Sequence, residues 1–362
     1  MNWVLIFLGF SLLIILHEAG HFFAAKATGM RVERFFLFFP PKLVSVKRGE
    51  TEYGIGAIPA GGFVKITGMN PDEELPPEVA ARGYYHQPVW KRIVVIGAGP
   101  AVNIVLAFAI LFALALGASD ASQNVDEVVP GSPAAGVLKP GDRILAIDGQ
   151  SYPSADTRTR LENFFDDVGA HKCAGRQIEG CKAATPVVLR VERDGQVKTI
   201  AVRPEYDKAA GRTRIGFSYG LEPANLGPGA AAERAGDALW LVASKTVTVF
   251  ARLFEEEQRK QVSGIVGVSS VANDQIDVGT REALTLLAIV SLSLGLINLF
   301  PFLPLDGGHI FWSLVEKVRG KPVPFRVMER AGALGFALVI MLFFLGLTND
   351  IGRLTGEGFD VR

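Results

Sequence analysis

The amino-acid sequence predicts a polytopic α-helical membrane protein with a small membrane-associated β region and an inserted extracytoplasmic α+β domain. The first observation is that the 362-residue chain has a positive mean hydropathy of +0.28 although 20% of its residues are charged, so that apolar and charged residues must be segregated along the chain. The second is the presence of several long, uncharged apolar stretches. The balance of 37 basic and 37 acidic residues excludes nucleic-acid binding by bulk positive charge, and the apolar content of 49% excludes a disordered chain.

Four apolar stretches are the predicted membrane spans, because a spanning helix needs about 20 predominantly apolar residues. The first could instead be a cleaved signal peptide, but it lacks a basic N-terminal region and an evident small-residue cleavage site, so we interpret it as a retained anchor. The four stretches are Trp3 to Ala25, Ile93 to Ala118, Ala283 to Leu305 and Ala331 to Thr348.

A fifth apolar segment, Ala238 to Phe254, has a different character. It carries Lys245, Thr248 and Arg252 at helical spacing, so one face of the helix would be polar. This pattern is typical of an amphipathic helix that lies on the membrane surface. A fifth span is the alternative interpretation.

The distribution of basic residues predicts the orientation of the chain. Outside the long segment 119–282, whose charges do not count because long domains are translocated regardless of charge, Lys and Arg are concentrated in residues 26–92 and 311–330, and few occur near the chain ends. Cytoplasmic loops carry an excess of these residues, so we expect both segments to face the cytoplasm. Both termini and the long segment 119–282 are then extracytoplasmic.

Residues 31–67, between the first two spans, form the predicted β region. This segment is rich in Phe, Val and Ile and is divided by glycines, which favours strands at Lys42 to Lys47, Glu52 to Ile58 and Gly62 to Thr67. The aromatic run Phe35 to Phe39 would be hazardous in water, so we expect it to contact the membrane.

Residues 119–220 have the pattern of a small α+β domain. A helix is expected at Leu161 to Val168, and Arg193-Asp194-Gly195 is a hairpin turn between two apolar runs. The run Ser132 to Gly149 closely resembles bacterial PDZ domains, which bind extended peptide C-termini by strand addition. Arg214 to Phe217 is a weak candidate for the carboxylate-binding loop, and a role as a spacer or steric filter is equally open.

Both cysteines, Cys173 and Cys181, lie in a polar insertion of this domain. A disulfide between them is chemically reasonable outside the cytoplasm. His171 makes a small metal site the less favoured alternative.

The pentapeptide His17 to His21 is the sharpest chemical signal. On a helix, residues four apart lie on one face about 6 Å apart along the axis, so both imidazoles can bind one Zn²⁺. Glu18, next to the first histidine, can take a proton from the attacking water. Ionisable side chains inside an apolar span are costly and mark function, which disfavours the alternative of two hydrogen-bonded core histidines.

Catalytic zinc usually has three protein ligands, and Asp306 is the best third candidate. It follows the third apolar stretch directly, where Pro301 and Pro304 break the helix. Irregular backbone at membrane depth is tolerated where it lines a buried or wet cavity. His309 is a rival ligand, but it opens the next helix and could simply support the site.

Together these motifs resemble the site-2 proteases, a family of intramembrane zinc metalloproteases, and specifically the bacterial sigma-E-regulating branch. The resemblance covers nearly the whole chain. It includes the PDZ insert, and the matching segments are His17 to His21, Tyr85 to Arg92, Gly97 to Asn103 and Asn298 to Gly308.

The resemblance implies a zinc endopeptidase of the bacterial inner membrane that hydrolyses peptide bonds of single-span proteins, such as anti-sigma factors or remnant signal peptides. It implies that His17, His21 and Asp306 hold Zn²⁺, and that Glu18 is the base and later the proton donor. Asn298 would contact the substrate backbone. The remaining implied substrate contacts lie in a membrane-associated strand region and are Gly61, Gly62 and Phe63.

Two departures concern the external region. The sigma-E branch commonly has two tandem PDZ domains, whereas this chain has room for one, and the cysteine insertion is unusual. The other function classes considered are a non-enzymatic PDZ-bearing scaffold and a metal transporter; no nucleic-acid partner is expected. The predicted division is two spans with the β region, a PDZ domain, a linker with the amphipathic helix, and the last two spans, at 1–118, 119–220, 221–282 and 283–362.

Overall fold

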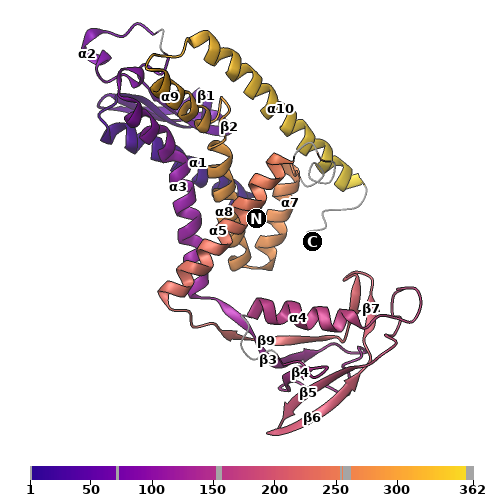
Figure 1. The fold of residues 1–362 in the computed structure, drawn as a ribbon. Helices are drawn as coiled ribbons and strands as arrows, with labels where there is room; N and C mark the ends of the chain where they lie inside the picture. The colour runs from indigo at the N-terminus through magenta and orange to yellow at the C-terminus, as the bar shows by residue number, and fades with distance from the viewer. Residues whose placement is uncertain (1, 71–72, 152–156, 253–254, 256–261, 356–362) are drawn as a thin grey trace. The chain divides into compact units, whose positions relative to one another are not determined.

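A computed structural model describes the chain except for residues 1, 71–72, 152–156, 253–254, 256–261 and 356–362 (Figure 1). The chain divides into two compact units. The first combines residues 1–115 with residues 228–362, and the second comprises residues 116–227.

Within the described residues of the first unit, four helices are long and apolar enough to cross a membrane. They correspond to the four predicted stretches. Their bounds are Asn2–Ala27 (α1), Val89–Leu116 (α3), Thr280–Asn298 (α8) and Phe325–Thr355 (α10).

Helix α8 differs from the predicted stretch at both ends. It begins three residues earlier, at Thr280, and ends at Asn298 rather than continuing to Leu305. The prolines at 301 and 304 explain the early end, because proline lacks the N–H that a helix interior requires. After this break the chain re-enters a helix, α9, which spans Asp306–Arg319.

Strands β1 (Val32–Arg48) and β2 (Thr51–Ile66) form an antiparallel sheet beside α1. The three predicted strand segments lie almost entirely within these two strands. The predicted break between the second and third segments was wrong, because β2 is one long strand that accommodates register shifts. The first half of β1 has partners in both halves of β2: Phe36 is paired with Phe63 and with Gly54. The long hairpin is therefore folded back, so that the first half of β1 lies between the two halves of β2.

The aromatic run of β1 is only partly available to a membrane. Phe36 is buried, and the ring of Phe35 packs edge-on against Phe22 of α1 at 5.2 Å between centroids. The rings of Phe22 and Phe35 belong to one hydrophobic core, in which apolar side chains of α1 and β1 are removed from water together. The exposed apolar side chains of the sheet include Phe39, Leu43, Val44, Val46, Ile55 and Ile58.

Three further helices belong to the described residues of the first unit. The predicted amphipathic helix is α5, which spans Pro228–Ala251 and so begins ten residues earlier than expected; residues 253–254 of the predicted segment lie outside the described residues. Helix α7 (Ile265–Val278) was not predicted. The short helix α2 (Pro77–Ala80) and a 3₁₀ turn, Tyr84–His86, precede α3.

The second unit is an antiparallel sheet in the order β6-β5-β4-β3-β9, with helix α4 (Thr157–Ala170) packed beside β9. The predicted hairpin turn is present: Asp194 and Gly195 both have positive φ, and Arg193 is paired with Gln196. The strands are Ser119–Val128 (β3), Arg143–Ile147 (β4), Val187–Arg193 (β5), Gln196–Val202 (β6), Glu205–Asp207 (β7), Arg212–Arg214 (β8) and Phe217–Pro223 (β9), of which β7 and β8 form a separate pair.

Candidate metal centre

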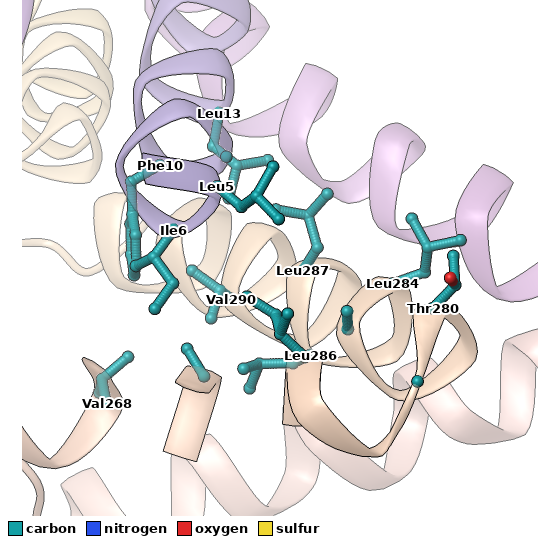
Figure 2. A pocket seen from close by; sticks show the side chains of 15 residues that line it. Leu5, Ile6, Phe10, Leu13, Val268, Thr280, Leu284, Leu286, Leu287 and Val290 are labelled. Atoms are coloured by element: carbon teal, nitrogen blue, oxygen red, sulfur yellow. The ribbon is translucent and has the colours of Figure 1, made fainter. Parts of the chain in front are cut away.

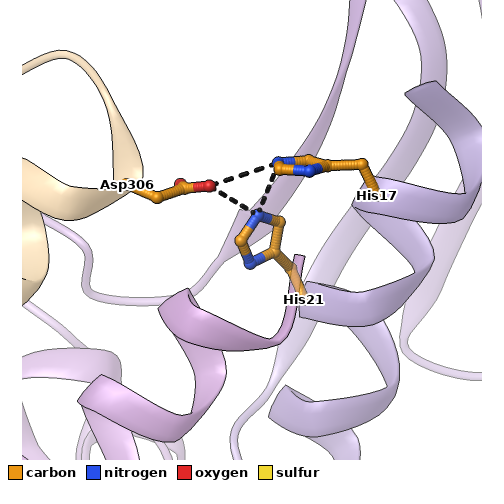
Figure 3. Close-up of side chains that lie close together, drawn as sticks. All are labelled: His17, His21 and Asp306. Atoms are coloured by element: carbon orange, nitrogen blue, oxygen red, sulfur yellow. Dashed lines mark hydrogen bonds and ion pairs between the residues drawn. The ribbon is translucent and has the colours of Figure 1, made fainter. Parts of the chain in front are cut away.

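Three buried or half-buried donor atoms converge at the junction of α1 and α9 (Figure 3). The Nε2 atoms of His17 and His21 lie 3.2 Å apart, as expected for residues four apart on one helix face. Asp306, the first residue of α9, places its Oδ2 atom 3.2 Å from Nε2 of His17 and 3.3 Å from Nε2 of His21. Each histidine is 7% exposed.

These distances fit a tetrahedral cation. With bonds of about 2.05 Å at the tetrahedral angle, two ligands of zinc are about 3.3 Å apart, close to the three observed separations. The tautomer of His21 also indicates a bound cation. Its Nδ1 lies 2.9 Å from the carbonyl oxygen of Val95 and donates to it, so in the neutral ring Nε2 carries a lone pair that faces a carboxylate oxygen. Two acceptors at this distance favour a cation between them.

Helix α3 packs closely against His21 of α1, and Gly99 makes this close packing possible. A Cβ atom at Gly99 would lie 2.3 Å from Nε2 of His21, and one at Gly20 would lie 2.6 Å from the carbonyl oxygen of Ala98. Both glycines therefore allow α1 and α3 to approach closely at the level of the two histidines. This contact accounts physically for part of the Gly97 to Asn103 motif.

The glycine pair after Asp306 has a comparable role. A Cβ at Gly307 would lie 2.1 Å from the carbonyl oxygen of Leu299, and one at Gly308 would lie 2.5 Å from the backbone nitrogen of Leu303. The first turn of α9 thus packs directly on the broken segment after α8. This packing places Asp306 beside His17 and His21 of α1.

Glu18 lies beside strand β2. A Cβ at Gly62 would be 2.9 Å from Cγ of Glu18, and the backbone N–H of Val64 is within hydrogen-bonding reach of the carboxylate. The structure therefore brings Glu18 and the predicted glycine-containing strand together. Gly61 has a φ of 151°, and the ring of Phe63 is stacked on those of Phe36 and Phe39.

Other predicted residues lie outside the cluster of three donors. The side-chain amide of Asn298 donates to the carbonyl oxygen of Leu294 in its own helix at 3.0 Å. His309, the rival ligand, is not in the donor group found among the described residues. Asn103 is fully buried at the contact of α3 with α8, where its carbonyl oxygen accepts a hydrogen bond from Ser291.

Sequence reasoning missed a buried ion pair near the site. Arg92 at the start of α3 is 2% exposed and donates two hydrogen bonds to Glu316 of α9, at 3.0 and 2.6 Å. The sequence signal was a basic residue at the edge of a span, which was interpreted as an orientation signal and as part of the matching segment Tyr85 to Arg92, but not as half of an ion pair. The carbonyl of Val95 had no sequence signal, because every residue carries one.

A second ionic contact joins α1 to the turn between β1 and β2. Glu50 accepts hydrogen bonds from Arg82 at 2.8 Å and from Lys26 at 2.7 Å. The Arg82 guanidinium, followed by Lys26, holds the pKa of Glu50 at about 2. This cluster fixes the end of α1 against the sheet.

In the second unit the sulfur atoms of Cys173 and Cys181 are bonded, with Cα atoms 6.1 Å apart. His171 lies between Asp148 and Thr185, with 2.8 Å to each, so both of its ring nitrogens have protein partners. That arrangement leaves His171 no free nitrogen for the small metal site considered as an alternative.

A model of peptidase family M50 matches residues 5–342. The chain belongs to this family. It is 32% identical over 374 residues to a Rhizobium meliloti protein named for a zinc metalloprotease activity, covering 96% of this chain and 95% of that protein. It is 31% identical over 409 residues to zinc metalloprotease Rip1 of Mycobacterium tuberculosis, covering 96% of both chains.

These findings confirm the resemblance to the site-2 proteases, and with it an intramembrane metalloprotease whose cofactor is zinc. The scaffold and transporter alternatives are not favoured. A comparison of structures also found the PDZ domain of an SdrC-like protein from Listeria innocua, at 25% identity and a TM-score of 0.21. It covers 27% of this chain and 92% of that domain.

Proposed function

We propose that His17, His21 and Asp306 hold the zinc ion and that Glu18 is the general base of an endopeptidase acting on single-span membrane proteins. The observation that carries this proposal is the convergence of three donor atoms at tetrahedral spacing, two of them on the predominantly apolar helix α1 and the third at the start of α9. Ionisable groups at that depth are costly unless they serve a function.

Glu18 and Asn298 have separate proposed roles in peptide-bond hydrolysis. When bound, zinc supplies Lewis acidity, polarising the substrate carbonyl and lowering the pKa of water. The Glu18 carboxylate takes one proton from the attacking water as the new C–O bond forms, and returns it to the amide nitrogen as the C–N bond breaks. The side-chain amide of Asn298 can both donate and accept, so it can hold the substrate backbone if it leaves its contact with Leu294.

Strand β2 is the proposed surface for the substrate backbone. A helical peptide bond cannot be attacked until its backbone is exposed, and pairing with a strand edge would hold it extended. Gly62 lies against Glu18, so a segment paired along Gly61 to Phe63 would pass the base directly. Displacement of the Glu18 carboxylate from the Val64 amide would accompany this pairing.

The proposed topology follows the basic residues. Both termini and residues 116–227 would be extracytoplasmic in a bacterial inner membrane, where the bond between Cys173 and Cys181 would persist. The second unit would be a PDZ domain. Strand β9 ends the order of the described strands in this sheet, and the proposed place for a peptide C-terminus is along this strand beside α4. The proposed substrates are anti-sigma factors or signal-peptide remnants.

The test uses purified full-length protein in lipid vesicles with a single-span model substrate. Glu18→Gln should abolish cleavage while leaving about one zinc per chain, because the substitution keeps the shape of the side chain and removes only the base. The matched control is Glu329→Gln, at an exposed glutamate of α10, which should cleave like the wild type. Cleavage by Glu18→Gln at the wild-type rate would refute the role of Glu18.

A further inference from the structure

An apolar cavity of about 280 Å³ lies between α1, α7 and α8 (Figure 2). Its walls include Phe10 and Leu13 of α1, Val268 of α7, and Leu287 and Val290 of α8. Among the described residues that line it, only Thr280 has a polar side chain. For comparison, an apolar protein cavity of about 150 Å³ is large enough for benzene. This cavity has room for more than one large apolar side chain.

The cavity lies on the same face of α1 as the metal ligands. Ile6, Phe10 and Leu13 line it, and His17 follows Leu13 by four residues, so these side chains form one helical stripe. Because an α-helix rises about 1.5 Å per residue, Leu13 is about 6 Å from His17 along the axis and Ile6 about 16 Å. The cavity therefore extends from one to about three helical turns beyond the zinc ligands, toward the N-terminus of α1.

We infer that this cavity is a specificity subsite that receives apolar side chains of the substrate's membrane segment; the inference rests on the proposed function. An extended substrate advances about 3.3 Å per residue. With its scissile bond at the metal centre, the side chains about two to five residues away, on the side toward the N-terminus of α1, reach the cavity. Cleavage then depends on large apolar residues at those positions.

The charges around the cavity favour a peptide side chain over a phospholipid. No Lys or Arg is among the described residues that line it. Beyond it, the side-chain amide of Asn2 donates to Asn273 at 3.3 Å and to Asp277 at 2.7 Å, which joins α1 to α7. An acidic residue at this position would repel a lipid phosphate, whereas a neutral apolar side chain has no such conflict.

Gly9 offers a way to fill the cavity without disturbing the fold. It lines the cavity, and a Cβ at this position would make an ordinary contact, 3.5 Å from Leu287. Gly9→Leu should therefore fold and occupy space that the substrate would use. The matched control is Leu8→Phe, which enlarges the adjacent, 56% exposed side chain on the outer surface of α1.

The experiment measures cleavage of two model substrates that carry Leu or Ala at the second to fifth positions from the cut. Wild type and Leu8→Phe should cleave the Leu substrate at least about tenfold faster than Gly9→Leu, a discrimination typical of an apolar pocket. Gly9→Leu should cleave the Ala substrate within about twofold of the wild-type rate on that substrate. Equal losses on both substrates, or no loss on either, would overturn the inference.

A second readout separates this inference from the proposed function. The Leu substrate is given a photoreactive phenylalanine analogue at the fourth position and is mixed with Glu18→Gln protein. Cross-linking should occur to residues of the cavity wall, and it should be lost when Gly9→Leu is combined with Glu18→Gln. If Glu18→Gln still cleaved, the role of the base would be wrong whatever the cross-links showed; cross-links confined to other surfaces, or a co-purified phospholipid that alone fills the cavity, would overturn the subsite.

Discussion

The substitution Gly99→Ala should remove zinc from the protein while leaving the fold intact. The methyl group would lie 2.3 Å from Nε2 of His21 and 2.6 Å from Cε1. Since van der Waals contacts of carbon begin at about 3.5 Å, the imidazole must move by about 1 Å. Metal sites tolerate deviations of only about 0.2 Å in their ligand distances, so His21 would be displaced from the ligand geometry.

The size of the effect can be bounded. Loss of a residue that merely orients a ligand costs about 10–100-fold in metal affinity, and direct displacement of a ligand should reach at least the upper end of that range. Zinc content after purification and competition with a chelator measure the loss. Gly97→Ala is the matched control, because it makes the same change two residues away, where the nearest atom to the new methyl would be 3.9 Å distant.

The outcome that would refute this reasoning is a Gly99→Ala protein with the zinc affinity of Gly97→Ala. Thermal unfolding provides the check on the fold. If Gly99→Ala lost zinc and also unfolded well below Gly97→Ala in the presence of a chelator, the clash would be disrupting the contact of α1 with α3 rather than the ligand alone.

Three further predictions concern other contacts. Asp306→Ala should lose zinc whereas His309→Ala should retain it, as measured by metal analysis; the reverse result would make the histidine the third ligand. Asp142→Ala removes a buried carboxylate that accepts two hydrogen bonds from the partly buried guanidinium of Arg193, and it should lower the free energy of unfolding of residues 116–227 by about 2 kcal/mol. Hydrogen exchange in the full chain can measure this loss, and a value below about 1 kcal/mol would contradict the prediction. The pKa of Glu50 falls from its ordinary 4.5 to about 2 beside Arg82. The ionised carboxylate therefore stabilises the folded protein by about 1 kcal/mol after solvent screening. This contribution is fully present above pH 4.5 and is lost as the pH falls toward 2. Glu50→Gln should remove that acid-dependent loss in pH-dependent unfolding.

The sequence brought out the three residues of the proposed metal centre better than the contacts that support them. Two histidines four apart need only one helical turn to meet, so local periodicity was sufficient for His17 and His21. Asp306 came from the prolines that break α8 and from the family resemblance. The tertiary support could not be predicted, because the Val95 carbonyl is a backbone atom and the importance of Gly99 depends on which helix packs against it.

The fold shows the same division between local and long-range information. Long apolar stretches predicted α1, α3, α8 and α10, since length and composition alone make a helix able to span a membrane. The pairing of β1 with β2 was not predictable in the same way. Phe36 has partners in both halves of β2, and no spacing within the strands specifies such a folded sheet.

Helix α3 carries none of the three proposed ligands, yet it contacts both helices that carry them. Its buried residues Arg92, Val95 and Gly99 are three and four apart, so they lie on one face. Gly99 and the Val95 carbonyl fix the ring of His21 on α1, while Arg92 holds Glu316 on α9, the helix that begins with Asp306. This face of α3 therefore positions α1, with the two histidines, relative to α9, with Asp306. The distance across the metal centre is determined by packing against α3, and changes on this face should alter metal affinity before they alter the fold.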